Sequence, residues 1–333
     1  MSDNSANNKR IAKNTLFLYF RTILIMLVTL YTSRVVLNTL GVEDFGVYNA
    51  VGGVVSMFAV ISGALSNAIS RYITYGLGKG DKEKLKMIFC TSVNIQIIIA
   101  LIIFVLCEIV GLWFLNSRMN IPEDRLVAAN WVLHCSLLTF VVNLISVPYN
   151  ACIIAHEHMN AYAYISIFDA ILKMSVAYLL IVSPVDKLIA YSVLLFVTAL
   201  GVRLLYGFYC GRHFKECKYK PIYDRVLFKE MMGFAGWNFF GNATSVLNIQ
   251  GVNILINVFF GVVANSARGI ASQIDAAVNQ LVVTFTTAVN PQITKSYAQG
   301  DSQRLNYLVC KGAKFSFFLL LLFAVPLFFE ADT

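Results

Sequence analysis

The stretches ITYGLGKGDKEKL at residues 73–85 and ITKSYAQGDSQRL at residues 293–305 are two versions of one pattern. A shift of 220 residues, without a gap, superimposes Ile-Thr, Gly-Asp and a basic residue followed by leucine. The same shift places Gly41-Val42 on Gly261-Val262 and Ala68 on Ala288. Internal similarity at a fixed spacing is typical of a duplicated structural unit. We therefore infer that the chain contains one unit twice.

The composition places this unit in a membrane. Of the 333 residues, 58% are apolar and only 13% are charged, against about 25% in a soluble domain. A soluble protein of this size could not bury that much apolar surface, which excludes a soluble enzyme, a disordered chain and a secreted disulfide scaffold. Continuous apolar runs such as 95–105 favour helices over the alternating strands of a transmembrane barrel. The sequence predicts an all-α polytopic helix bundle.

About 20 apolar residues are needed for each crossing of the bilayer. Nine spans result, of which the second, seventh and eighth are weak because they contain glycine, serine, asparagine and charged residues. We place them at 14–38, 46–75, 87–115, 126–150, 160–183, 187–210, 233–259, 263–290 and 313–330.

The net charge of +8 comes mainly from basic residues on one side of these spans. Lysines and arginines concentrate before residue 14 and within 71–86, 212–229 and 295–314. Because basic loops stay in the cytoplasm, we expect a multi-pass protein of the cell inner (cytoplasmic) membrane with a cytoplasmic N-terminus. This distribution accounts for the charge without nucleic-acid binding. No cleavable signal peptide is predicted.

The repeated unit is six spans long, so its two copies share one orientation. Parallel repeats of this kind are typical of secondary transporters. We expect an N-terminal six-helix lobe at 1–211, a basic cytoplasmic linker at 212–232 and an incomplete three-helix lobe at 233–333. Because the second copy stops after three spans, the sequence predicts a truncated chain.

Polar and charged residues inside the spans are the candidate functional residues, because charge in a bilayer is costly and faces a cavity or a partner. The alternative for such polar faces is tight helix packing with hydrogen bonds between helices. The acid and base of the fifth span are four residues apart and could equally form a packing pair. The candidates are Arg21 in the first span, Asp169 and Lys173 in the fifth, Asn238, Asn242 and Asn253 in the seventh, and Arg268, Asp275 and Asn279 in the eighth.

Enzymatic motifs do not stand out. His156-Glu157-His158 lacks the spacing of a zinc-binding HExxH helix, and Gly78-Lys79-Gly80 lacks the frame of an ATP-binding loop. The seven cysteines show no paired ligand spacing and are expected to be small apolar core residues. We therefore predict no metal, no cofactor and no enzyme, so transport would depend on an ion gradient, the membrane potential or downhill flow.

Three segments resemble a known family. SRVVLNTLGVEDFGVYNAVGGVVSMF (33–58), FAGWNFFGN (234–242) and NPQITKSYAQGD (290–301) are similar to the polysaccharide and O-antigen flippases of the multidrug/oligosaccharidyl-lipid/polysaccharide exporter superfamily. This resemblance implies two six-helix lobes in a MATE-like V. It also implies alternating-access export of polyprenyl-pyrophosphate-linked oligosaccharide for O-antigen, lipopolysaccharide or capsule biosynthesis.

Under this reading Arg21, Arg268 and Lys173 contact the anionic substrate. Asp275 and Asp169 adjust their charge and couple a proton or sodium ion, and the asparagines line a hydrated lumen. Two alternatives stay open. The first is a multidrug cation antiporter that uses Asp275, Asp169 and Glu108 as acids. The second is a truncated, non-transporting fragment or membrane scaffold. A membrane-embedded glycosyl- or acyltransferase ranks behind both, since His134 and the histidines of the 156–158 loop are poor catalytic candidates.

Overall fold

The computed structural model describes the backbone of residues 2–56, 58–117, 119, 121–221 and 224–329. Side chains are described over the same ranges except at 2–9, 56, 59–60, 246–247, 249–251, 253–254, 257–258, 260–271, 273–274, 277, 323 and 327–328. This part of the chain is helical nearly throughout and contains no strand.

The first three spans run through helices α1 (Ser2–Ser56), α2 (Ala59–Lys79) and α3 (Lys82–Ser117). The helix α1 is bent at Gly41, whose backbone angles are φ 82° and ψ 169°. Glycine adopts this conformation without a steric penalty, so the chain can reverse there and return as the second span. The expected spans 14–38 and 46–75 therefore lie on the two sides of one glycine.

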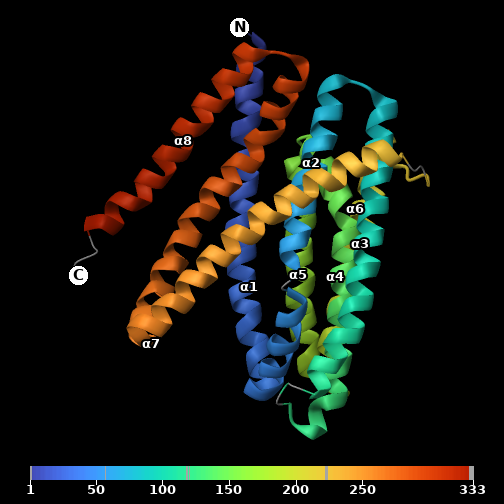
Figure 1. The fold of residues 1–333 in the computed structure, drawn as a ribbon, viewed down its shortest axis with the longest axis vertical. Coiled ribbons are helices and arrows are strands. Elements are labelled where there is room, and N and C mark those ends of the chain that lie inside the picture. The colour runs from blue at the N-terminus through green and yellow to red at the C-terminus, as the bar shows by residue number, and fades with distance from the viewer. Residues whose placement is uncertain (1, 57, 118, 120, 222–223, 330–333) are drawn as a thin grey trace.

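Five further helices complete the described chain. They are α4 (Leu126–Ala155), α5 (Met159–Val182), α6 (Lys187–His213), α7 (Arg225–Gln299) and α8 (Ser302–Phe329). Two short 3₁₀ turns, η1 (Glu123–Arg125) and η2 (Lys215–Cys217), precede α4 and follow α6. Figure 1 shows that α7 doubles back on itself, so its two arms correspond to the expected seventh and eighth spans.

The predicted duplication is visible in backbone detail. Gly80 and Gly300 end their helices with φ 75°, and the N–H of each glycine donates to the carbonyls three and four residues earlier. The next residues, Asp81 and Asp301, accept hydrogen bonds at 3.0 Å from the N–H groups of Lys84 and Arg304. A left-handed glycine cap followed by an aspartate N-cap is thus repeated after 220 residues. The predicted parallel repeat is therefore present in the backbone.

The two repeats meet at the end of the bundle that carries the N-terminus. A Cβ placed on Gly78 would lie 2.6 Å from the Cβ of Ala298, its counterpart after the 220-residue shift. A residue that touches its own counterpart lies on the pseudo-twofold axis, and glycine permits this close approach. Figure 1 shows α1 and the second arm of α7 together at this end and apart at the other. We call it the N-terminal end below.

Six helical stretches of the described chain are long and apolar enough to cross a membrane. The helices α2 and α7 are not among them, in agreement with the weak hydropathy expected for the second, seventh and eighth spans. A core of buried side chains, including Ile69, Phe89 and Ile153, joins α2, α3, α4 and the start of α7. This core fixes the frame around which the polar cavities lie.

Candidate functional site

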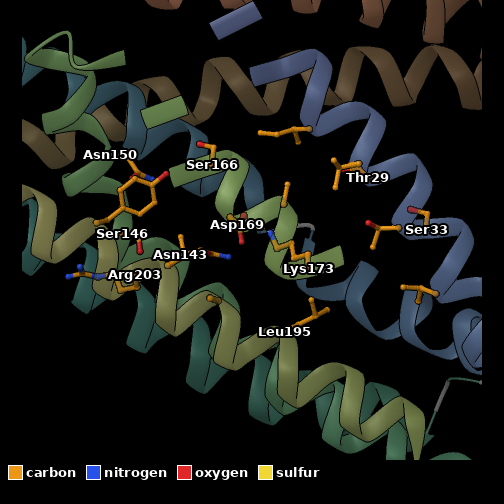
Figure 2. A pocket seen from close by; sticks show the side chains of 18 of the residues that line it. Thr29, Ser33, Asn143, Ser146, Asn150, Ser166, Asp169, Lys173, Leu195 and Arg203 are labelled. Carbon is orange, nitrogen blue, oxygen red and sulfur yellow. Dashed lines mark hydrogen bonds and ion pairs between the residues drawn. The ribbon is translucent and has the colours of Figure 1, made fainter. Parts of the chain in front are cut away.

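A polar cavity of about 690 Å³ lies among the first six spans, between α1, α4, α5 and α6. Figure 2 shows Thr29 and Ser33 of α1 opposite the pair Asp169 and Lys173 of α5. Arg203 of α6 lies toward the far side of the same cavity. We call this space the repeat-one cavity.

Arg21 of α1 lines the repeat-one cavity and contacts α5. Its guanidinium carbon lies 4.6 Å from the centroid of the Tyr162 ring, and its Nη2 donates to the Tyr162 hydroxyl at 3.5 Å. The Arg21 Nε is buried and has no hydrogen-bond partner among the described residues. The Tyr162 ring orients the guanidinium group of Arg21, and the Nε–H of that group remains without an acceptor among the described residues.

Of the other two cations of the cavity, Lys173 is paired with an acid among the described lining residues and Arg203 is not. Lys173 Nζ and Asp169 Oδ2 form an ion pair at 2.8 Å within α5. The pairing predicted from their spacing is therefore present, and it faces the cavity. The guanidinium carbon of Arg203 lies 3.8 Å from the centroid of the Tyr149 ring and has no acidic side chain beside it among the cavity-lining residues. The lining thus carries three cations and one carboxylate.

Neutral polar groups complete the lining. Asn143, Ser146 and Asn150 follow one face of α4 and all line the cavity. The Asn150 Oδ1 and the Thr32 Oγ1 are buried without a hydrogen-bond partner in the described part of the protein. Buried polar atoms are normally paired with protein, water or a ligand. Together with the Arg21 Nε, these atoms make the cavity a site with unused hydrogen-bonding capacity.

A second cavity, of about 630 Å³, lies between α2, α4 and the two arms of α7. Its walls contain residues related by the repeat, such as Asn67 with Thr287 and Ser70 with Asn290. Asn238 also lines it and donates to the carbonyl of Phe234 at 2.9 Å. Equivalent helices therefore meet around a polar space, as the parallel repeat predicts, and we call this the inter-repeat cavity.

The remaining candidates lie elsewhere on α7. Asp275 and Asn279 are exposed, and the Asn279 Nδ2 donates to Asp275 Oδ1 at 2.9 Å. Asn242 is half-buried. The side chains of Arg268 and Asn253 lie outside the described residues. Of the three basic candidates, Arg21 and Lys173 share one cavity, and this cavity lies within the first repeat and not between the repeats.

Some cavity residues were not among the sequence candidates. Arg203 of α6 is one of them, because it lines the cavity while its guanidinium group rests on the ring of Tyr149. The polar residues of α4 at 143, 146 and 150 are spaced as neighbours on one helical face, and that spacing was the available signal. Among the described residues, no group of three or more metal-ligating side chains could hold a metal ion.

Comparison with known proteins identifies the family. Residues 11–297 match the family described as "Polysaccharide biosynthesis protein". The chain belongs to this polysaccharide biosynthesis family. A relative is EpsK of Bacillus subtilis (strain 168), described as an uncharacterized membrane protein, which is 21% identical over 303 residues. These residues make up 90% of this chain but 59% of EpsK, so the chain spans about three fifths of this relative.

Solved structures show the fold of this family member. A multidrug resistance MATE family transporter of the MOP superfamily, in the outward-facing conformation, has a TM-score of 0.79 at 14% identity. The match covers 96% of this chain and 72% of that one. A MOP superfamily transporter from Pyrococcus furiosus Vc1 (DSM3638) also gives 0.79 at 14% identity, over 98% of this chain and 72% of that one. The predicted MATE-like helix bundle is confirmed.

Proposed function

We propose that this multi-pass membrane protein acts as a flippase for polyprenyl-pyrophosphate-linked oligosaccharide, working by alternating access. The observation that carries the proposal is the repeat-one cavity, with three cations, one carboxylate and several polar atoms without partners. Membership of the polysaccharide biosynthesis family supports a substrate of this class.

The charge of the cavity favours an anionic ligand. The carboxylate of Asp169 is already paired with Lys173, so Arg21 and Arg203 supply the excess positive charge. Both guanidinium groups rest on aromatic rings, which holds them in place, and the Arg21 Nε has no hydrogen-bond partner among the described residues. Charge-assisted hydrogen bonds from guanidinium to phosphate are short, directional and strong. A pyrophosphate fits this chemistry better than a cationic drug does.

The neutral lining suits the sugar part of the substrate. Asparagine and serine side chains of α4 and the hydroxyls of α1 can donate to and accept from sugar hydroxyls. The polyprenyl tail needs no polar cavity and can stay in the lipid. In this proposal Arg268, Asp275, Asn253 and the other asparagines of α7 line the path on the side of the second repeat.

Pocket polarity separates this proposal from the cation-antiporter alternative. For the transporter from Pyrococcus furiosus, the reverse polarity of the binding pocket suggests a different function. In the described part of this chain, the acids named for cation exchange have polar or basic partners. Asp169 pairs with Lys173, and Glu108 lies 2.9 Å from the imidazole of His134.

The proposal includes an orientation. The N-terminus is cytoplasmic, residues 1–211 form one lobe, 212–232 form the linker and 233–333 belong to the second lobe. The basic residues of the linker and of the 79–86 and 295–314 segments then lie in the cytoplasm of the cell, beside the inner membrane.

The test is transport by the native protein in proteoliposomes. We expect it to move a fluorescent undecaprenyl-pyrophosphate-linked oligosaccharide between leaflets and not to exchange ethidium for protons or sodium ions. The Arg203→Gln variant should move the lipid-linked sugar at least about tenfold more slowly, because one charge-assisted phosphate contact is lost. The matched control is Arg212→Gln on the same helix, where the arginine is exposed and does not line the cavity.

Two results would contradict the proposal. One is ion-driven exchange of ethidium without movement of the lipid-linked sugar, which would favour the antiporter. The other is equal transport by Arg203→Gln and Arg212→Gln, which would remove the cavity from the substrate path.

A further inference from the structure

The turn between α4 and α5 contains an acid in an unusual position. Glu157 is the one non-glycine residue of the described chain with a positive φ, at 62°. This left-handed conformation is unfavourable for a residue with a Cβ, so surrounding contacts must hold it. Its side chain is 1% exposed, although it lies at the N-terminal end of the bundle and outside the spans. A buried carboxylate in a strained turn indicates a specific partner.

The partners of Glu157 come from both repeats. The Arg10 Nη2 of α1 lies 2.7 Å from its Oε2, and the Lys295 Nζ at the end of α7 lies 2.8 Å from its Oε1. The Gln292 Nε2, also on α7, donates to Oε2 at 3.0 Å, and Arg304 of α8 holds Gln292 at 3.3 Å. Among the ion pairs of the described residues, Glu157–Lys295 is the one that joins the first six spans to α7 and α8.

Electrostatics strengthens this contact. Burial by itself raises the pKa of the Glu157 carboxyl, but Lys295, Arg10 and Gln292 together hold that pKa below its usual range. The carboxylate is therefore charged at neutral pH. Burial, the neighbouring His156 and His213, and the cations Lys295 and Arg10 lower the pKa of His158. The adjacent imidazole is thus neutral there and adds no competing charge.

The repeat relates this contact to a second one. The 220-residue shift carries Arg10 to Glu230 and Tyr72 to Gln292. The Tyr72 hydroxyl donates to Glu230 Oε1 at 3.2 Å and so joins α2 to the start of α7. The contacts Tyr72–Glu230 and Gln292–Glu157–Arg10 therefore join equivalent helices on the two sides of the axis where Gly78 meets Ala298.

We propose that Glu157 is the main latch that keeps the two repeats closed at the N-terminal end, and that Tyr72–Glu230 is its weaker counterpart. The Glu157 contacts are stronger than the Tyr72–Glu230 hydrogen bond because of where the two lie. Glu157 is buried between two cations, whereas the Tyr72–Glu230 hydrogen bond is single and exposed. An alternating-access cycle that opens this end must separate Glu157 from Lys295. This proposal does not depend on the substrate.

The test measures access to the inter-repeat cavity in membrane vesicles that contain the native protein. The reporter is Asn67→Cys, at an exposed position that lines this cavity, in a Cys310→Ser background because Cys310 is the exposed cysteine among the seven. A membrane-impermeant maleimide is added to the N-terminal face. We expect slow labelling of the parent, and labelling at least about tenfold faster in Glu157→Gln, which keeps the shape but removes the buried charge. Glu230→Gln should accelerate labelling less.

Two further variants keep the test decisive. Lys295→Gln removes the other partner of the same ion pair. It therefore tests the latch even if Glu157→Gln does not fold. Because both act on one contact, the double variant should label no faster than Glu157→Gln alone. The control Asp44→Asn removes a buried carboxylate paired with Arg125 at 3.1 Å, entirely within the first six spans.

Labelling of Glu157→Gln and Lys295→Gln at the parental rate would overturn the proposal. Equal acceleration by Asp44→Asn would also overturn it, because general loosening would then explain the effect. Both results concern closure alone, so they leave the flippase proposal untouched. Conversely, a failed transport assay would not affect the latch.

Discussion

Substitution of Arg21 by glutamine tests a cation that carries a buried donor without a partner among the described residues. The guanidinium is half-buried, rests on Tyr162 and has an Nε without a partner among the described residues. Glutamine can still donate a hydrogen bond toward Tyr162, so the local packing of α1 on α5 is largely kept. The charge and the unused donor are lost. The measured change therefore reports on ligand binding more than on folding.

The magnitude follows from the kind of contact. A hydrogen bond to a charged group contributes about 1.5–3 kcal/mol net. At about 1.4 kcal/mol for each factor of ten, loss of this contact weakens binding by about 10- to 100-fold. Because Lys173 and Arg203 remain, binding should be weakened and not abolished. The affinity of the unmodified protein should also fall as salt is added, since the contact is ionic.

The assay is titration of the native protein in lipid nanodiscs with farnesyl pyrophosphate, a short polyprenyl pyrophosphate without sugar. The matched control is Arg34→Gln on the same helix, because Arg34 is exposed and does not line the cavity. We expect Arg34→Gln to bind within about twofold of the unmodified protein, as is usual for an exposed substitution. Equal affinities of Arg21→Gln and Arg34→Gln would refute the assignment of the repeat-one cavity as the pyrophosphate site.

Two further predictions concern the contact between the repeats. Gly78→Ala should destabilise the protein by about 1–3 kcal/mol, since its Cβ would overlap Ala298, and thermal unfolding in detergent should show this relative to Gly63→Ala, where a Cβ meets nothing within 4 Å. The latch should also respond to pH with a defined sign. Because the folded-state pKa of Glu157 is lowered, its stabilisation is complete above the ordinary glutamate pKa of about 4.3 and is lost as the pH falls through the lowered value. The maleimide labelling rate from the N-terminal face, divided by the rate for free cysteine at the same pH, should therefore stay low from about pH 8 to pH 5, above that ordinary value, and an increase in this ratio would contradict the assignment.

The frame of the protein could be predicted because its signals are local. Gly80 and Gly300 end helices in a conformation that glycine favours, and the aspartate after each begins the next helix. Gly41 bends α1 in a different positive-φ conformation, with φ 82° and ψ 169°, which glycine also adopts readily. Each of these signals involves a few adjacent residues, so the repeat and the span order follow from the sequence without knowledge of the packing.

The site could be predicted only in part because it depends on which helices pack together. The polar face of the first span indicated Arg21, and the spacing of Asp169 and Lys173 indicated their ion pair, which the structure contains. That these residues share a cavity with Arg203 and Asn150 depends on contacts between four helices. No spacing within one helix contains that information.

Glu157 shows how a motif can hide a different role. In the sequence it lies between two histidines, and the natural question was whether the three residues bind a metal. The partners that matter, Arg10 and Lys295, are more than 130 positions away in both directions along the chain. Only the return of α7 to the N-terminal end brings Lys295 next to the turn.

The comparison of the two repeats indicates why the acid of the latch comes from the α4–α5 turn. The position equivalent to Arg10 is occupied by Glu230, so the two copies carry opposite charges at one structural site. Glu230 needs only a donor, and Tyr72 of the neighbouring helix supplies one. Arg10 and Gln292 both contact the Oε2 of Glu157, so the acid that pairs with Arg10 comes from the α4–α5 turn.

The same reasoning applies to the cation that defines the repeat-one cavity. The position equivalent to Arg21 is Gly241, so the second repeat lacks this charge at the corresponding place. Duplication therefore preserved the backbone frame, including both glycine caps, while the charged side chains diverged between the copies. Under the proposed function the described anion-binding groups belong to the first repeat, and Lys295 of the second repeat contacts Glu157 of the first. Substrate binding and closure are thus assigned to different residues, and variants at Arg21 and at Glu157 should separate the two experimentally.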